Sequence, residues 1–156
     1  MTAIAIRTAR ANEAQALSDL AMRSKAHWGY GDTFLAACRD ELTVTAAMIA
    51  AGDVRVAEGD GTLRGLHRLS VSKNEACVEL LYVDPTAIGS GVGRRLWHDL
   101  VQRAVAAGAT RLLIEADPHA EGFYVRMGAV RTGSCPSGSI PGRMLPLLEL
   151  NLGATP

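Results

Sequence analysis

Apolar side chains recur every three or four residues over residues 11–24, which is the spacing of an amphipathic helix. We predict a helix there with Asn12 as its N-cap, preceded by a short strand over residues 3–7. A second helical region is expected over residues 33–51. Between the two helices, residues 27–32 contain two glycines that interrupt the helical pattern, so we expect a loop there.

Three strand-like segments follow at residues 54–58, 63–71 and 76–83. Their connections are short and polar, which is typical of antiparallel hairpins. Residues 91–107 then carry a continuous apolar face at helical spacing, and residues 111–116 form an apolar strand. If the helix is the crossover between two strands, the strands before and after it run parallel.

A short helix over residues 119–126 and two strands over residues 130–132 and 145–150 complete the order. Helices, then antiparallel strands, then a βαβ unit predict an α/β (α+β) fold, with a mixed, largely antiparallel sheet and helices on both faces. No repeat, low-complexity tract or linker divides the sequence. We therefore expect a single domain over residues 1–156.

Composition narrows the classes of function. The 16 basic residues balance 16 acidic ones, which argues against a protein held on nucleic acid by phosphate contacts and against a polybasic membrane anchor. No apolar run approaches the roughly 20 residues of a membrane-spanning helix, and no secretory signal is visible, so we expect a cytoplasmic protein. The three cysteines, Cys38, Cys77 and Cys135, are widely spaced and suggest neither a disulfide framework nor a metal site.

The most informative segment is VELLYVDPTAIGSGVGRRLW, residues 78–97, in which a strand ends and three glycines open a helix. The glycines are Gly89, Gly91 and Gly93. A helix N-terminus presents unpaired N–H groups and about half a positive charge, and glycine lets an anion approach the backbone closely. A phosphate group is the natural ligand. The alternative is a turn used only for tight packing of helix on sheet.

Two other phosphate-binding motifs fit this segment less well. No GxxxxGK followed by Ser or Thr is present. A dinucleotide fingerprint needs GxGxxG directly after a strand and an acid about 20 residues later, a place that Glu115 or Asp117 could take. However, position 94 is Arg, and residues 84–88 separate the strand from the glycines. A nucleotide-binding module is therefore disfavoured.

The run LYVDP at residues 81–85, followed by GSGVG at residues 89–93, resembles the acyl-CoA motif of the GCN5-related N-acetyltransferase (GNAT) family. Downstream, AEGFYVRMGA at residues 120–129 resembles the A-x-x-F-Y-x-x-x-G segment of the same family, at the expected distance. The resemblance covers the chain broadly. It implies a GNAT-like fold whose central βαβ unit binds acetyl-CoA, with no metal.

The same resemblance implies that amides of the turn hold the CoA pyrophosphate and that the preceding strand pairs with the pantetheine arm. The chain departs from the family at Ile88, where Arg or Gln is usual, and at Asp117, where Asn is frequent. The acetyl-CoA contacts that it predicts are Leu81, Tyr82, Val83, Ile88, Gly89, Ser90, Gly91, Val92, Gly93, Arg94, Asp117 and Tyr124.

Family resemblance also implies direct attack of an amine on the thioester. The amine must lose a proton, and the departing thiolate gains from a proton donor. Tyr124 stands at the position of the family's thiolate-directed tyrosine, and Glu79, on the strand before the turn, could take the amine proton through water. His27 and His119 are alternative bases. A backbone N–H of residues 81–83 could stabilise the oxyanion.

The acceptor is less well defined by the sequence. Trp28 and Tyr30 are candidates for the acceptor pocket, although they could equally hold their loop to the core. Weaker candidates for contact with a polar acceptor are Ser137, Ser139 and Arg143. Balanced charge and short loops favour a small-molecule amine. Acetylation of a protein or peptide amine and a catalytically silent CoA-binding regulatory domain stay open, and the family resemblance adds the expectation of a homodimer.

Overall fold

The computed structural model describes residues 3–153, and within that range its elements follow the predicted order. The strands are β1 (Ala5–Thr8), β2 (Val54–Gly59), β3 (Thr62–Ser72), β4 (Glu75–Val83), β5 (Arg111–Glu115), β6 (Val130–Pro136) and β7 (Met144–Asn151). The helices are α1 (Ala14–Ala26), α2 (Asp32–Leu42), α3 (Ala46–Ala50), α4 (Val92–Ala106) and α5 (Glu121–Arg126), with short 3-10 turns η1 (Ala11–Glu13) and η2 (Pro85–Ala87).

The strands form one sheet in the order β1-β2-β3-β4-β5-β7-β6. Every neighbouring pair is antiparallel except β4 and β5, which are parallel and joined through α4. The structure thus confirms the predicted fold class: a mixed, largely antiparallel sheet with a central βαβ unit. No helix in the described range is both long and apolar enough to cross a bilayer.

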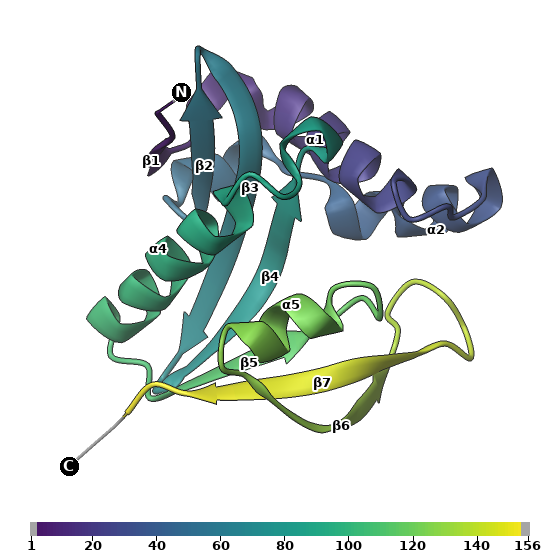
Figure 1. Ribbon diagram of the computed structural model, residues 1–156, viewed down its shortest axis with the longest axis vertical. Helices are drawn as coiled ribbons and strands as arrows, with labels where there is room; N and C mark the ends of the chain where they lie inside the picture. The colour runs from purple at the N-terminus through teal and green to yellow at the C-terminus, as the bar shows by residue number, and fades with distance from the viewer. Residues whose placement is uncertain (1–2, 154–156) are drawn as a thin grey trace.

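The two faces of the sheet are covered by different helices (Figure 1). Leu17 and Leu20 of α1 pack on one face against alternate residues of β2 such as Val54. On the other face, Val92 and Leu96 of α4 pack with Ala57, Leu81 and Val83. The remainder of α4 extends this layer over β5 and β7 with Trp97, Leu100 and Ala104.

The parallel strands β4 and β5 stay together for only part of their length. Their paired residues run from Glu75–Arg111 to Val78–Ile114. Beyond Val78, β4 continues to Val83 and pairs only with β3. Figure 1 shows the two strands diverging from a common base. The open side of β4 therefore presents backbone groups that have no strand partner, a common basis for binding an extended ligand.

Some local predictions were wrong. Asn12 is not an N-cap, because it lies inside η1; the side chain of Glu13 instead accepts the backbone N–H of Arg10 at 2.7 Å, and Arg7 ion-pairs with Glu13. The last hairpin is also longer than predicted: β6 extends to Pro136 because it stays paired with β7 that far. The predicted domain ends, residues 1–2 and 154–156, lie outside the described residues.

Candidate active site

A cavity of about 590 Å³ lies where β4 and β5 separate. Its walls come from the end of α1, the unpaired half of β4, the turn before α4, the end of β5 and α5. The structure brings to it most of the residues that the sequence singled out: Trp28, Glu79, Leu81, Tyr82, Val83, Ile88, Gly89, Gly91, Gly93, Arg94, Asp117, His119 and Tyr124. Tyr30, Ser90 and Val92 are not part of the lining.

The glycine turn forms one end of this cavity. Gly89 (φ +84°) and Gly91 (φ +89°) adopt the left-handed conformation that favours glycine, and Gly91 is the N-cap of α4. A Cβ built on either residue would meet no atom within 4 Å, so the space over the turn is open. Gly93 lies closer to neighbouring side chains, because a Cβ there would be in van der Waals contact with the ring of Phe123 at 3.4 Å.

Ser90 and Val92 contribute to the turn itself. The hydroxyl of Ser90 donates to the carbonyl of Ala87, and its backbone N–H donates to the same oxygen at 3.2 Å. The side chain of Val92 is buried in the core. The first N–H groups of α4 that lack an intrahelical acceptor are therefore those of Val92, Gly93 and Arg94. They point the positive end of the helix dipole towards the turn.

Glu79 occupies an irregular point of β4. Across the β3–β4 pair, Arg68 is opposite Leu80 and Leu69 is opposite Val78, so Glu79 is the extra residue of a β-bulge. Bulges redirect side chains next to functional sites. The carboxylate of Glu79 is exposed, lines the cavity and accepts a hydrogen bond from the Ser70 hydroxyl at 2.7 Å.

Tyr124 is held in α5 by aromatic packing, with its ring 5.6 Å from Trp97 and 5.3 Å from Phe123. Its side chain is 6% exposed, and burial, with the charge of Asp117, raises the pKa of the phenol above its ordinary value. The phenol therefore keeps its proton at neutral pH. Within residues 3–153 no hydrogen-bond partner faces its hydroxyl, so the proton is available to a ligand in the cavity.

Glu115 is a cavity residue that the sequence did not single out for this site. It follows Ile114, the last residue of β5 that pairs with β4, just as Glu79 follows Val78 on β4; on its other side Glu115 still pairs with Leu147 of β7. Both carboxylates are exposed in the cavity, and neither forms an ion pair with any described residue. Glu115 accepts only a weak hydrogen bond from Cys135 Sγ, at 3.4 Å. Its signal in the sequence is a carboxylate directly after the apolar run LLI, inside the strand predicted over residues 111–116.

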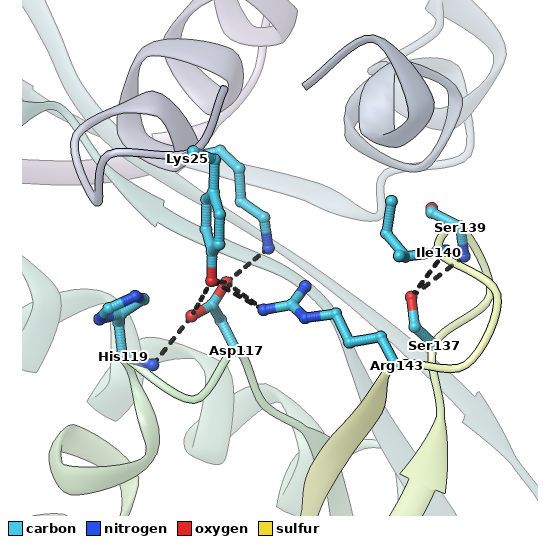
Figure 2. Close-up of polar contacts among 8 residues, drawn as sticks. Lys25, Asp117, His119, Ser137, Ser139, Ile140 and Arg143 are labelled. Carbon is cyan, nitrogen blue, oxygen red and sulfur yellow. Dashed lines mark hydrogen bonds and ion pairs between the residues drawn. The ribbon is translucent and has the colours of Figure 1, made fainter. Parts of the chain in front are cut away.

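Asp117 lies at the centre of a polar cluster (Figure 2). Its carboxylate accepts hydrogen bonds from Lys25 Nζ at 2.7 Å, from the Tyr30 hydroxyl at 2.9 Å and from the backbone N–H of His119 at 2.8 Å. Arg143 lies 3.5 Å from the same carboxylate and donates to the Tyr30 hydroxyl at 2.7 Å. Burial alone would raise the pKa of Asp117. The hydrogen bonds, that from Lys25 foremost, have the larger opposite effect, so the net shift of the pKa is downwards.

The two loop aromatics have different surroundings. Trp28 is 41% exposed, lines the cavity and stacks on His119 with ring centroids 5.1 Å apart. Tyr30 lies outside the cavity lining, stacked on Phe34 at 4.1 Å and bonded to Asp117. His27 contacts the edge of the Trp28 ring and is not in the lining. Of the two alternative bases, only His119 therefore reaches the cavity.

Ser137, Ser139 and Arg143 also lie outside the lining. The hydroxyl of Ser137 accepts the backbone N–H groups of Ser139 and Ile140, which shapes the β6–β7 loop (Figure 2). Their contact with an acceptor stays a prediction. Across the described part of the chain, no group of three or more His, Cys, Asp or Glu side chains is placed to hold a metal ion.

Comparisons with known proteins point the same way. A family model described as an acetyltransferase (GNAT) domain matches residues 12–136. A search of curated protein sequences finds no match. PaiA N-acetyltransferase from Thermoplasma acidophilum, solved in complex with coenzyme A, superposes with a TM-score of 0.76 at 17% identity, covering 96% of this chain and 99% of that one.

Two further solved structures have the same fold. A GCN5-related N-acetyltransferase from Rhodopseudomonas palustris gives a TM-score of 0.76 at 23% identity, covering 97% of both chains. YncA from Salmonella typhimurium, with its cofactor acetyl-CoA, gives 0.70 at 19% identity, covering 99% of this chain and 96% of that one. The family model matches most of the chain, and the solved structures share its fold. The chain therefore belongs to the GNAT acetyltransferase family.

Proposed function

We propose that the chain is an acetyl-CoA-dependent N-acetyltransferase that acetylates a primary amine of a small molecule by direct attack. One observation carries the proposal: a single cavity joins the glycine turn of α4, the unpartnered hydroxyl of Tyr124 and two carboxylates without ion-pair partners. These are the groups that a phosphate, a leaving thiolate and an ammonium ion, respectively, would need.

The described residues fit acetyl-CoA at both ends. The amides of Val92, Gly93 and Arg94 and the dipole of α4 would bind the pyrophosphate, with open space above Gly89 and Gly91 to admit it. The unpaired side of β4, from Leu81 to Val83, would hydrogen-bond the pantetheine amides in the manner of an added strand. Asp117 was also predicted to contact acetyl-CoA, and it lines the same cavity.

Acetyl-CoA supplies a thioester carbonyl that is already activated for attack. The amine nitrogen forms a bond to the carbonyl carbon, and the carbon–sulfur bond breaks. Glu79 takes the proton of the amine, directly or through water, and Tyr124 protonates or hydrogen-bonds the sulfur as it leaves. The raised pKa of Tyr124 keeps it in the donor form that this step requires.

Electrostatics favour a cationic acceptor. The last β4–β5 pair includes Ile114, which is buried on the α4 face of the sheet, so the next side chain, Glu115, points to the opposite face. Glu79 and Glu115 thus place two carboxylates without ion-pair partners where the strands part. Such a site attracts an ammonium ion, and the exposed indole of Trp28 adds an aromatic surface of the kind that cations bind.

The function is tested by screening polyamines, amino acids, aminoglycosides and basic peptides for acceptor-dependent release of CoA thiol, with the acetylated product identified by mass spectrometry. Efficient acetylation of a small amine is expected. Selective acetylation of peptides would replace the small-molecule assignment with a protein substrate. Calorimetric binding of acetyl-CoA without turnover of any acceptor would favour a regulatory CoA-binding domain instead.

A further inference from the structure

The carboxylate of Asp117 connects three segments that are distant in sequence. Lys25 and Tyr30 belong to the end of α1 and the loop after it, and their bonds to Asp117 span 92 and 87 positions. Arg143 ends the β6–β7 loop and reaches both Asp117 and Tyr30. The backbone N–H of His119 joins the segment before α5 to the same carboxylate. Figure 2 shows the side chains of Lys25 and Arg143 directed at Asp117 from different chain segments, and the backbone nitrogen of His119 joined to it.

The charge of Asp117 is essential to this arrangement. Lys25 is 8% exposed and Arg143 is also largely shielded, so two mostly buried cations share one ionised carboxylate. The ammonium of Lys25 lies 5.4 Å from the centre of the Tyr30 ring, and the guanidinium of Arg143 lies 5.2 Å from it. A neutral residue at position 117 would leave both cations without their counter-ion, a costly state for a buried group.

This cluster sets the position of one wall of the cavity. His119, whose backbone N–H binds Asp117, carries the ring on which Trp28 stacks, with the two planes 1° apart. The ring of Tyr30 contacts His119 edge-on at 5.7 Å. Trp28 and His119 both line the cavity, whereas Tyr30 and Arg143 do not. Asp117 therefore connects residues outside the cavity to the aromatic pair that faces the acceptor.

We propose that Asp117 is a positioning residue for the acceptor site. With Lys25, Tyr30 and Arg143 it fixes the stacked Trp28–His119 pair, and this role replaces the contact with acetyl-CoA that the sequence predicted for it. Because both oxygens of its carboxylate already accept hydrogen bonds from the protein, little capacity is left for the pantetheine arm. The inference rests on the proposed function, because only an acetyltransferase has an acceptor site. The position of the Trp28–His119 pair can nevertheless be tested without any acceptor.

The first test uses the two tryptophans of the chain, Trp28 and Trp97, as reporters. Incorporation of 5-fluorotryptophan gives one ¹⁹F resonance for each, and Trp28→Phe identifies them. Asp117→Asn should shift or broaden the Trp28 resonance and leave that of buried Trp97 in place. Tyr30→Phe removes only the hydroxyl that joins Asp117 to Arg143, so it should give the same effect in smaller measure in a protein that folds readily.

Asp99→Asn is the matched control, because it makes the same chemical change in a shielded ion pair with Arg55 elsewhere in the fold. It should leave the Trp28 resonance unchanged. If neither Asp117→Asn nor Tyr30→Phe moves the Trp28 resonance, the proposal is overturned. It is also overturned if Asp99→Asn moves that resonance equally, because the signal then reports general loosening.

The second test separates the acceptor from acetyl-CoA. In Asp117→Asn and Tyr30→Phe, calorimetry should give an acetyl-CoA Kd within about threefold of the wild type, and the KM for an acceptor from the screen should rise about tenfold or more, with a smaller change in kcat. A tenfold loss of acetyl-CoA affinity with an unchanged acceptor KM would restore Asp117 to the cofactor site. Failure of every acceptor in the screen would count against the proposed function, while the ¹⁹F result would still decide the role of Asp117.

Discussion

Val78 of β4 and Ile114 of β5 are the last residues that the two parallel strands pair. The next residues, Glu79 and Glu115, flank the point where the strands part, and both line the cavity. Neither has an ion-pair partner in residues 3–153, so both carboxylates are available to the cationic acceptor that we propose.

Glu79→Gln should lower kcat by roughly 10²-fold at neutral pH, because the amide cannot accept the amine proton. The loss should shrink as pH rises and more of the amine is already neutral. Glu115→Gln is the matched variant: it removes the same charge at the strand split, and we expect a higher acceptor KM with a smaller effect on kcat. Full pH–rate profiles check both. If the Glu79→Gln variant has the pH–rate profile of the wild type, Glu79 is not the base.

Gly91→Glu should weaken acetyl-CoA binding because it places a carboxylate at the proposed pyrophosphate site. Any side chain at Gly91 is strained by its left-handed backbone (φ +89°), at a cost of about 1–2 kcal/mol. Gly91→Ala carries the same strain without the charge, so it is the appropriate control. By calorimetry, the Glu variant should bind at least about tenfold more weakly than the Ala variant. Equal affinities in two folded variants would place the pyrophosphate elsewhere.

The order and type of the elements could be predicted because each has a regular hydrophobic period and clear turn residues. Gly52 and Gly108, which the structure places at the ends of α3 and α4 with positive φ, are examples. The cap of the first helix could not be predicted, because Glu13 is held there by its ion pair with Arg7 of β1, a contact between separate elements. The length of β6 was also hidden, since pairing with β7 and not local composition extends it to Pro136.

The lining of the candidate site could be predicted where its residues lie in one continuous motif, as at the glycine turn and Tyr124. The Asp117 cluster could not, because Lys25, Asp117 and Arg143 come together only through the tertiary fold. Glu115 was missed for a related reason: its exposure in the cavity depends on where β4 and β5 stop pairing. The residue at which two strands stop pairing depends on tertiary structure and cannot be predicted from the local sequence.

The stability of the protein should fall in mild acid because of His67. This side chain is completely buried, with Nε2 at 2.8 Å from Asp99, and burial lowers the pKa of His67 despite the carboxylate. Below about pH 6.5, His67 therefore binds a proton in the unfolded chain but stays neutral in the folded chain. The free energy of unfolding then decreases as pH falls, by at most about 1.4 kcal/mol per pH unit.

The control for this prediction is His67→Gln, which can still donate to Asp99 but does not titrate. Its loss of stability between pH 7 and 5, measured by urea unfolding, should be smaller than that of the wild type. Hydrogen bonds from His67 and Arg55 outweigh burial and lower the pKa of Asp99, so its stabilising effect is present above about pH 4 and is lost only at lower pH. Identical slopes in the two proteins would show that His67 does not titrate differently on folding.

Tyr124→Phe provides the most direct test of acetyl transfer in this cavity, measured as turnover of the best amine from the screen beside the acetyl-CoA Kd. The variant keeps the ring packed against Trp97 and Phe123 and deletes only the hydroxyl. We predict a 10- to 10³-fold fall in kcat with little change in Kd. The lower end corresponds to the loss of a hydrogen bond to the sulfur, and the upper end to the loss of a general acid. Since burial raises the pKa of Tyr124, the alkaline side of the pH–rate profile should keep its shape. Wild-type turnover by the folded variant would contradict the account and make Tyr124 a packing residue.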